Sequence, residues 1–121
     1  MKTRIAGTIA LVMALSVAAP ASAETGNEML QNCAEFLKEN GEIDGYFKSG
    51  VCAGFVSGVT NTVAYARDAS PATVKICIPD GFTIGQGIRV LKKYLIDHPK
   101  DLHRSATALA LTAYREAYPC D

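Results

Sequence analysis

The chain has 121 residues, of which 49% are apolar and 20% charged, and its twelve basic side chains balance twelve acidic ones. This composition excludes an intrinsically disordered chain and a collagen-like repeat, and the charge balance provides no basic surface for nucleic acid. Two histidines offer little for a metal or acid–base site. Four cysteines in so short a chain are more informative.

The first 23 residues are organised like a secretory signal peptide. Lys2 and Arg4 precede an uncharged apolar run over residues 5–17, and Ala21-Ser22-Ala23 is a small-residue cleavage site. The run is shorter than the roughly 20 apolar residues that a membrane span needs, which favours a cleaved leader over a membrane anchor. We therefore expect cleavage after Ala23 and an exported mature domain over residues 24–121.

The mature chain repeats apolar residues at the helical period of 3.6, which predicts an all-α fold: a small disulfide-bonded bundle of about four helices. The first helix is expected over residues 27–39, ended by Asn40-Gly41, and Gly45 is expected to close the turn that follows. The second helix is expected over residues 46–68, followed by a long loop over residues 69–82.

The third helix is predicted to begin after Thr83, whose spacing to Gln86 matches a capping box, and to end at His98-Pro99. The fourth is predicted to start near Pro99 or Lys100 and to end at Tyr118. Its expected inner face is rich in alanine, and comprises Leu102, Ala106, Leu109, Ala113 and Ala117.

Three glycines recur at every fourth position of the second helix: Gly50, Gly54 and Gly58. Each interior glycine costs roughly 0.8–1 kcal/mol relative to alanine, so the pattern needs an explanation. In a membrane it would be a dimerisation face, but polar and charged neighbours exclude a span. We predict instead that the fourth helix packs closely on this ridge.

The four cysteines lack the C-x-x-C spacing of zinc or redox sites, so export favours structural disulfides. Three pairings are possible. Cys33 and Cys52 are centred on position 42.5, within the first predicted turn, and Cys77 and Cys120 on 98.5, at the His98-Pro99 turn. Because facing residues of a helical hairpin lie equally far from its turn, these two pairs are preferred.

No catalytic or metal-binding constellation is recognisable. His98 and His103 are five residues apart across a helix break, which is not the spacing of a zinc-binding helix face. Ser57 and Ser105 lack the motif of a nucleophile elbow, and Gly85-Gln86-Gly87 lacks a phosphate-loop lysine. We therefore predict a protein that is not an enzyme and needs no metal or cofactor.

Several apolar residues are expected to face outward from the last helix: Leu111, Tyr114 and Tyr118. Isolated exposed hydrophobic side chains are normal on soluble proteins. The alternative is a dimer or partner surface, for which tyrosines are favoured anchors.

The order and spacing of several short motifs resemble the Rap/Tai family of immunity proteins. The motifs are Cys52-Ala53-Gly54-Phe55-Val56-Ser57-Gly58, Ile76-Cys77-Ile78-Pro79, Gly85-Gln86, Tyr94-Leu95-Ile96-Asp97-His98-Pro99, Leu102-His103 and Tyr118-Pro119-Cys120. Tyr118 departs from the phenylalanine expected there. The resemblance implies an exported helical protein, commonly a homodimer, that neutralises a peptidoglycan amidase delivered by type VI secretion.

If the chain is such an inhibitor, its longest loop is the segment best able to enter an active site. The candidate partner-binding residues are Arg67, Asp68, Ser70, Thr73 and Lys75. The alternative is a plain solvated connector, because loops are polar whether or not they bind anything.

The sequence leaves two functions open. The first is a periplasmic immunity protein that binds and blocks an amidase effector. The second is a periplasmic acid-stress chaperone of the Hde type, which exposes apolar surface when acid protonates its carboxylates. The adjacent gene would discriminate them, because an amidase gene there favours immunity.

Overall fold

The computed structural model describes residues 23–36 and 43–121, so residues 1–22 of the predicted 23-residue leader and the Asn40-Gly41 turn lie outside the described chain. The described elements are α1 (Gly26–Glu35), α2 (Ile43–Ala69), α3 (Ile84–Asp97), a 3-10 helix (Pro99–Asp101) and α4 (Ala106–Ala117). Two isolated β-bridges are the only extended pairings in these ranges. The predicted all-α fold is confirmed.

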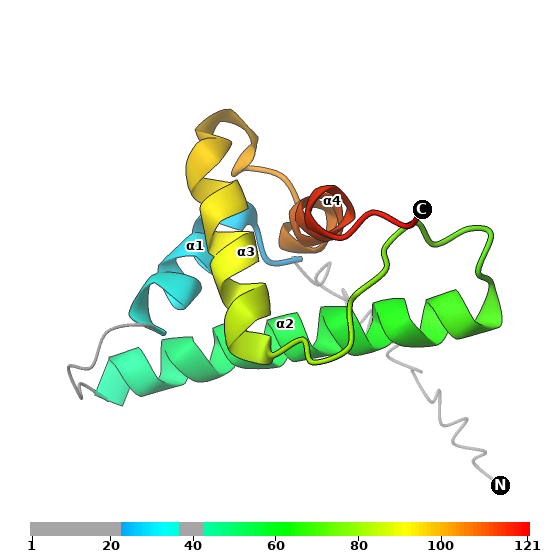
Figure 1. Ribbon diagram of the computed structural model, residues 1–121. Coiled ribbons are helices and arrows are strands. Elements are labelled where there is room, and N and C mark those ends of the chain that lie inside the picture. Colours follow the sequence, from blue (N-terminus) through cyan, green and yellow to red (C-terminus); the bar gives the residue numbers. More distant parts are fainter. Residues whose placement is uncertain (1–22, 37–42) are drawn as a thin grey trace, which may run out of the picture.

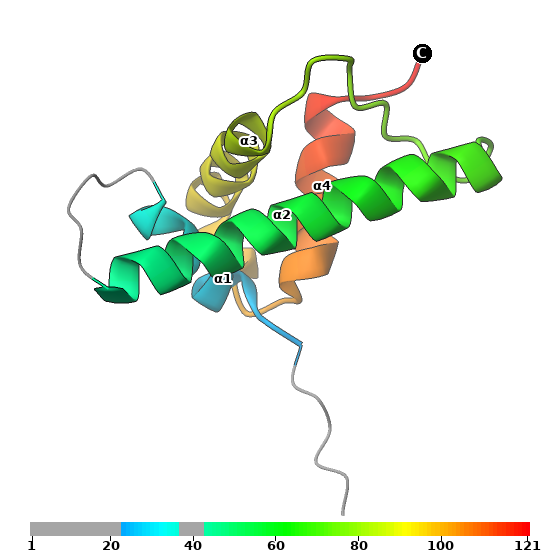
Figure 2. The ribbon, with the colours of Figure 1, turned by 90° about the horizontal axis from the view of Figure 1, so that it is seen from below.

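The long helix α2 supports the other three helices, which all lie on one of its sides (Figure 1). The view from below shows its opposite side uncovered (Figure 2). The core lies between α2 and the other helices. Its fully buried members include Met29, Cys33, Cys52, Val56, Ile88, Leu91, Leu95, Leu109 and Tyr114.

Side chains cap the first turns of α1 and α3. The Thr25 hydroxyl accepts a hydrogen bond from the Glu28 amide, and the Glu28 carboxylate accepts one from the Thr25 amide at 2.7 Å. That backbone hydrogen bond lowers the pKa of Glu28. Thr83 caps α3 as predicted by accepting from the Gln86 amide, but the Gln86 side chain donates to the Tyr118 hydroxyl instead of completing a capping box.

Two predicted helix starts are wrong. Helix α2 begins at Ile43, so Gly45 lies inside the helix and does not close a turn. Helix α4 begins at Ala106, because the chain after the 3-10 helix leaves the helical path to pair with the start of α1. The amides of Gly26 and Asn27 donate to carbonyls of this segment, and the Ala106 amide donates to the Glu24 carbonyl at 2.8 Å.

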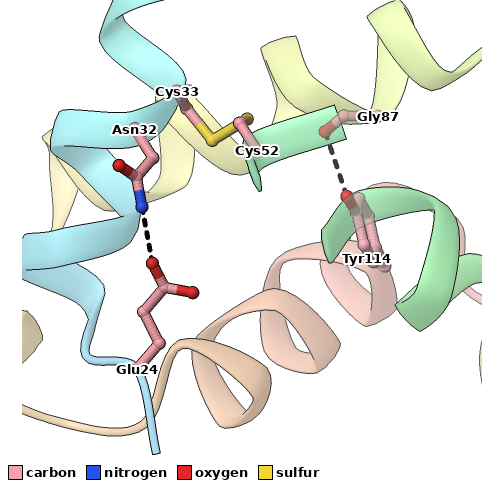
Figure 3. The surroundings of a disulfide bond; sticks show 6 residues. All are labelled: Glu24, Asn32, Cys33, Cys52, Gly87 and Tyr114. Atoms are coloured by element: carbon pink, nitrogen blue, oxygen red, sulfur yellow. Dashed lines mark hydrogen bonds between the residues drawn. A yellow bond between two sulfur atoms is a disulfide. The ribbon is translucent and has the colours of Figure 1, made fainter. Parts of the chain in front are cut away.

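The predicted disulfide pairing is confirmed. Cys33 is bonded to Cys52 between α1 and α2, and Cys77 is bonded to Cys120. Figure 3 shows the first of these bonds, next to the hydrogen bond from Asn32 to Glu24 that holds the residue preceding Thr25.

The predicted packing of α4 on the glycine ridge is wrong. A β-carbon added at Gly50, Gly54 or Gly58 would meet no atom within 4 Å, because these glycines lie on the uncovered side of α2. Helix α4 packs mainly against α3 and contacts α2 less. Of its predicted inner face, Ala106, Leu109 and Ala113 are buried, Leu102 is half-buried and Ala117 is exposed.

The close approaches are made by two other glycines. A β-carbon at Gly87 would lie 2.6 Å from the Phe82 ring and 2.8 Å from Val56 Cγ1, where α3 crosses α2. At Gly26 it would lie 2.5 Å from Leu109 Cδ1 and 3.1 Å from the backbone of Leu102. These glycines therefore set the distances between the helices.

Candidate partner-binding site

The C-terminal part of α2 projects beyond the rest of the bundle, together with the start of the loop after it, as both views show (Figures 1 and 2). We call residues 67–75 the projecting segment. It contains all five predicted partner-binding residues, two at the end of α2 and three in the loop. The structure therefore brings these residues to one end of the molecule.

A compact turn shapes the tip of the projecting segment. The Ser70 amide continues the helical pattern by donating to the Ala66 carbonyl at 2.9 Å. The Thr73 amide donates to the Ser70 carbonyl, and the Thr73 hydroxyl lies 2.7 Å from the Ser70 hydroxyl and 2.9 Å from the Ser70 carbonyl oxygen. Ser70 and Thr73 thus hold the turn, and Lys75 is left exposed beside it.

Two grooves flank the end of α2. One, of about 470 Å³, lies between α2 and the returning chain over residues 76–84. The other, of about 550 Å³, lies between the projecting segment and the Cys77–Cys120 disulfide. Arg67 and Asp68 line both grooves, so these two residues lie between the grooves.

The grooves carry charges of both signs. Lys75 and Asp121 line the groove at the disulfide, and Asp80 lines the other. Charged groups at the rim of a binding surface favour complementary partners and fix their register. This surface is therefore polar and carries charges of both signs.

The base of the projecting segment is anchored to the end of α4. Ile76 is only 3% exposed and bridges Pro119, and the Cys77 amide donates to the Tyr118 carbonyl at 2.8 Å. The packing of this part of the loop against the end of α4 was not predicted from the sequence. Val74, Ile76 and Ile78 alternate with Lys75 and Cys77, a period of two that indicates an extended segment with one buried face.

The predicted outward position of Tyr114 is wrong. Its ring is fully buried and its hydroxyl donates to the Gly87 carbonyl at 3.1 Å, as Figure 3 shows. Burial also raises the pKa of Tyr114. Tyr118 is half-buried, with its ring edge-to-face with Phe82, and half-buried Leu111 lines an apolar groove against α2.

The two histidines differ in their surroundings. His98 stacks on the Tyr94 ring with centroids 4.0 Å apart, and its Nδ1 lies 2.7 Å from the Tyr94 carbonyl oxygen. His103 is exposed. Over residues 23–36 and 43–121, no three His, Cys, Asp or Glu side chains are grouped so as to hold a metal ion. Within the same ranges, no helix is both long and apolar enough to cross a membrane.

The fold places the chain among small, all-α proteins that are cross-linked by disulfides. It belongs to the Rap1a immunity protein family, which it matches over residues 25–120. It is thus an immunity protein of the type VI secretion kind, whose family members bind a cognate effector protein and are inhibitors rather than enzymes. Comparisons with curated proteins and with solved structures found no match.

Proposed function

We propose that this protein is exported to the periplasm, where it binds and blocks a peptidoglycan amidase effector of type VI secretion. The family match over nearly the whole predicted mature chain carries the proposal. A leader cleaved after Ala23 would deliver the chain to the compartment in which such an effector meets peptidoglycan, and in which disulfides persist.

The projecting segment is the proposed contact with the effector. It extends beyond the bundle, its tip is exposed, and its base is anchored by Ile76 and by the Cys77–Cys120 disulfide. A segment held in place before binding loses less conformational freedom when the complex forms. Arg67 and Lys75 supply the cations and Asp68 the anion of this contact.

The test is inhibition of a peptidoglycan amidase effector of type VI secretion, with the product of the adjacent gene as the first candidate, measured on purified peptidoglycan. Arg67→Ala combined with Lys75→Ala is expected to weaken inhibition at least tenfold, about 1.4 kcal/mol. The melting temperature is expected to change little, because Lys75 is exposed and neither cation has an ion pair among the described residues.

Lys100→Ala combined with Arg104→Ala is the matched control. It likewise removes one lysine and one arginine, but these lie around the 3-10 helix, far from the projecting segment. This control is expected to inhibit like the unaltered protein. Full inhibition by the Arg67 and Lys75 variant, with loss on substitution of Leu111 or Tyr118, would place the effector contact on α4 instead.

We also propose a homodimer that forms through the uncovered side of α2. An apolar groove of about 370 Å³ lies along the edge of this side, lined by Gly54, Gly58 and Val59 of α2 and by Leu111 of α4, among others. Helix α2 carries no charged side chain from Ser49 to Ala66, so a second copy meets no like charge across this face.

The arrangement of this face is symmetrical, as a two-fold dimer requires. Phe47 and Tyr65 are 74% and 76% exposed and lie at equal distances in sequence on either side of the midpoint between Gly54 and Gly58. Two antiparallel copies of α2 that cross at this midpoint would bring Phe47 of one copy toward Tyr65 of the other.

Gly58→Glu is expected to convert the dimer to a monomer, measured by sedimentation velocity over a range of concentrations. The site is open, so the new side chain fits the monomer while it places a charge in the seam. Ile96→Glu is the control, since Ile96 is 55% exposed on α3 and outside the groove. A dimer that survives Gly58→Glu but not Ile96→Glu would contradict the proposed interface.

A further inference from the structure

The two disulfides differ in their access to solvent. Cys33 and Cys52 are fully buried in the core, whereas Cys77 and Cys120 are partly exposed and line the groove of about 550 Å³ beside the projecting segment. A reducing thiolate must reach a sulfur atom to attack it. The second bond can therefore be reduced in the folded protein, while the first becomes accessible only when the core opens.

The accessible Cys77–Cys120 bond is also the covalent link between the chain that directly follows the projecting segment and the residues after α4. After Ala69 the chain forms a turn whose hydrogen bonds join its own residues. It packs against the bundle again only at Val74 and Ile76. Near this point, one backbone hydrogen bond, from Cys77 to Tyr118, and the Cys77–Cys120 bond join it to the end of α4. Reduction would leave that hydrogen bond and the apolar contacts of Val74, Ile76 and Ile78 to hold the segment.

The bundle itself does not depend on this link. The buried core lies mainly among α1, α2, α3 and α4; from the loop it includes Ile76, but neither Cys77 nor Cys120. The Cys33–Cys52 bond continues to join α1 to α2 when the other bond is broken. Loss of the exposed disulfide thus changes the mobility of one segment within a folded protein.

We propose that the Cys77–Cys120 disulfide is a redox gate on the projecting segment: reduction by a dithiol releases the segment from the end of α4, and the reverse exchange with the oxidised, disulfide form of that dithiol restores it. A dithiol is the reductant. Its thiolate attacks one sulfur, the protein S–S bond breaks, and a mixed disulfide forms. Its second thiolate then displaces the remaining cysteine, so that two protein thiols and one oxidised dithiol result. The effect on inhibition rests on the function proposed above.

The gate can be tested without an effector. The protein is treated with graded dithiothreitol, its free thiols are alkylated, and the modified cysteines are identified by mass spectrometry. We expect Cys77 and Cys120 to be alkylated at concentrations that leave Cys33 and Cys52 bonded, with the helical circular dichroism retained. Simultaneous reduction of both bonds would overturn the proposal.

Release of the segment is measured by limited trypsin digestion after Lys75. This bond precedes the buried Ile76, so its cleavage requires the segment to leave the bundle. We expect reduction to accelerate the cleavage at least tenfold, and the Cys77→Ser and Cys120→Ser double variant to be cut rapidly with or without reductant. Cleavage after Lys93 or Lys100 is the internal control, and an unchanged rate after Lys75 would overturn the gate.

Inhibition of the amidase is the final measurement. We expect the oxidised protein to inhibit, the partly reduced protein to inhibit at least tenfold less, and reoxidation to restore inhibition. Full inhibition by the partly reduced protein would contradict the gate. If the oxidised protein fails to inhibit while reduction still exposes Lys75 to trypsin, the proposed function is wrong and the gate stands.

Discussion

Gly87→Leu is expected to lower the free energy of unfolding by about 2–3 kcal/mol, because overpacking a well-filled core typically has a cost of this size. The new β-carbon would lie 2.6 Å from the Phe82 ring and 2.8 Å from Val56 Cγ1. Val56 is short, β-branched and fully buried, so it has little freedom to move aside. The Tyr114 hydroxyl, 3.3 Å from the same position, closes the remaining side.

Gly54→Leu is the matched control for this prediction. It makes the same chemical change in a helix interior, but at a position with no atom within 4 Å. Leucine is a better helix former than glycine by about 0.8 kcal/mol, so this variant is expected to be slightly more stable than the unaltered protein. Chemical unfolding followed by circular dichroism measures both variants, and equal destabilisation by the two would contradict the structure.

The triple variant Gly50→Ala, Gly54→Ala and Gly58→Ala is expected to be more stable by about 2.4–3 kcal/mol. Each replacement gains roughly 0.8–1 kcal/mol of helix propensity, and no added methyl group meets a neighbour. For a domain of this size, each kcal/mol raises the melting temperature by about 4–8 °C. The measurement uses protein dilute enough to be monomeric.

The triple variant also separates stability from assembly. If the glycine ridge is the seam of the proposed dimer, the same three methyl groups should weaken dimerisation while they stabilise the monomer. Gly26→Ala is the contrasting variant, because its β-carbon would lie 2.5 Å from Leu109 Cδ1, and we expect it to be destabilised. An unchanged melting temperature for the triple variant would indicate that α2 is not helical over this stretch in solution.

Local signals in the sequence are sufficient to predict the number of helices and the disulfide pairing, but not every helix start. The 3.6-residue period identifies four helices, and the turn-centred spacing of the cysteines identifies both bonds. Thr25 and Glu28 also have the spacing of a capping box, a further local signal that marks the start of α1.

The errors arise where a residue's role depends on distant parts of the chain. Gly50 and Gly87 are both helix glycines, and only the placement of α3 across α2 decides which one allows a close approach. Helical periodicity wrongly predicts Tyr114 on the surface, because the sequence contains no sign that the Gly87 carbonyl lies above its hydroxyl. The projecting segment is correctly predicted to include a loop, but its anchoring at Ile76 depends on the position of the end of α4.

Both ends of α4 are joined to remote parts of the chain, which has a consequence for the order of folding. Thr25 bridges Ser105 ahead of the helix, and Ile76 bridges Pro119 beyond it. Contacts between residues so far apart in sequence close large loops, and such contacts form late and slow the folding of small proteins. The long α2 and its disulfide partner α1 can associate early, whereas the backbone pairing of Gly26 and Asn27 must wait for the segment that leads into the last helix. We therefore expect this helical protein to fold more slowly than a bundle whose helices pair only with their neighbours.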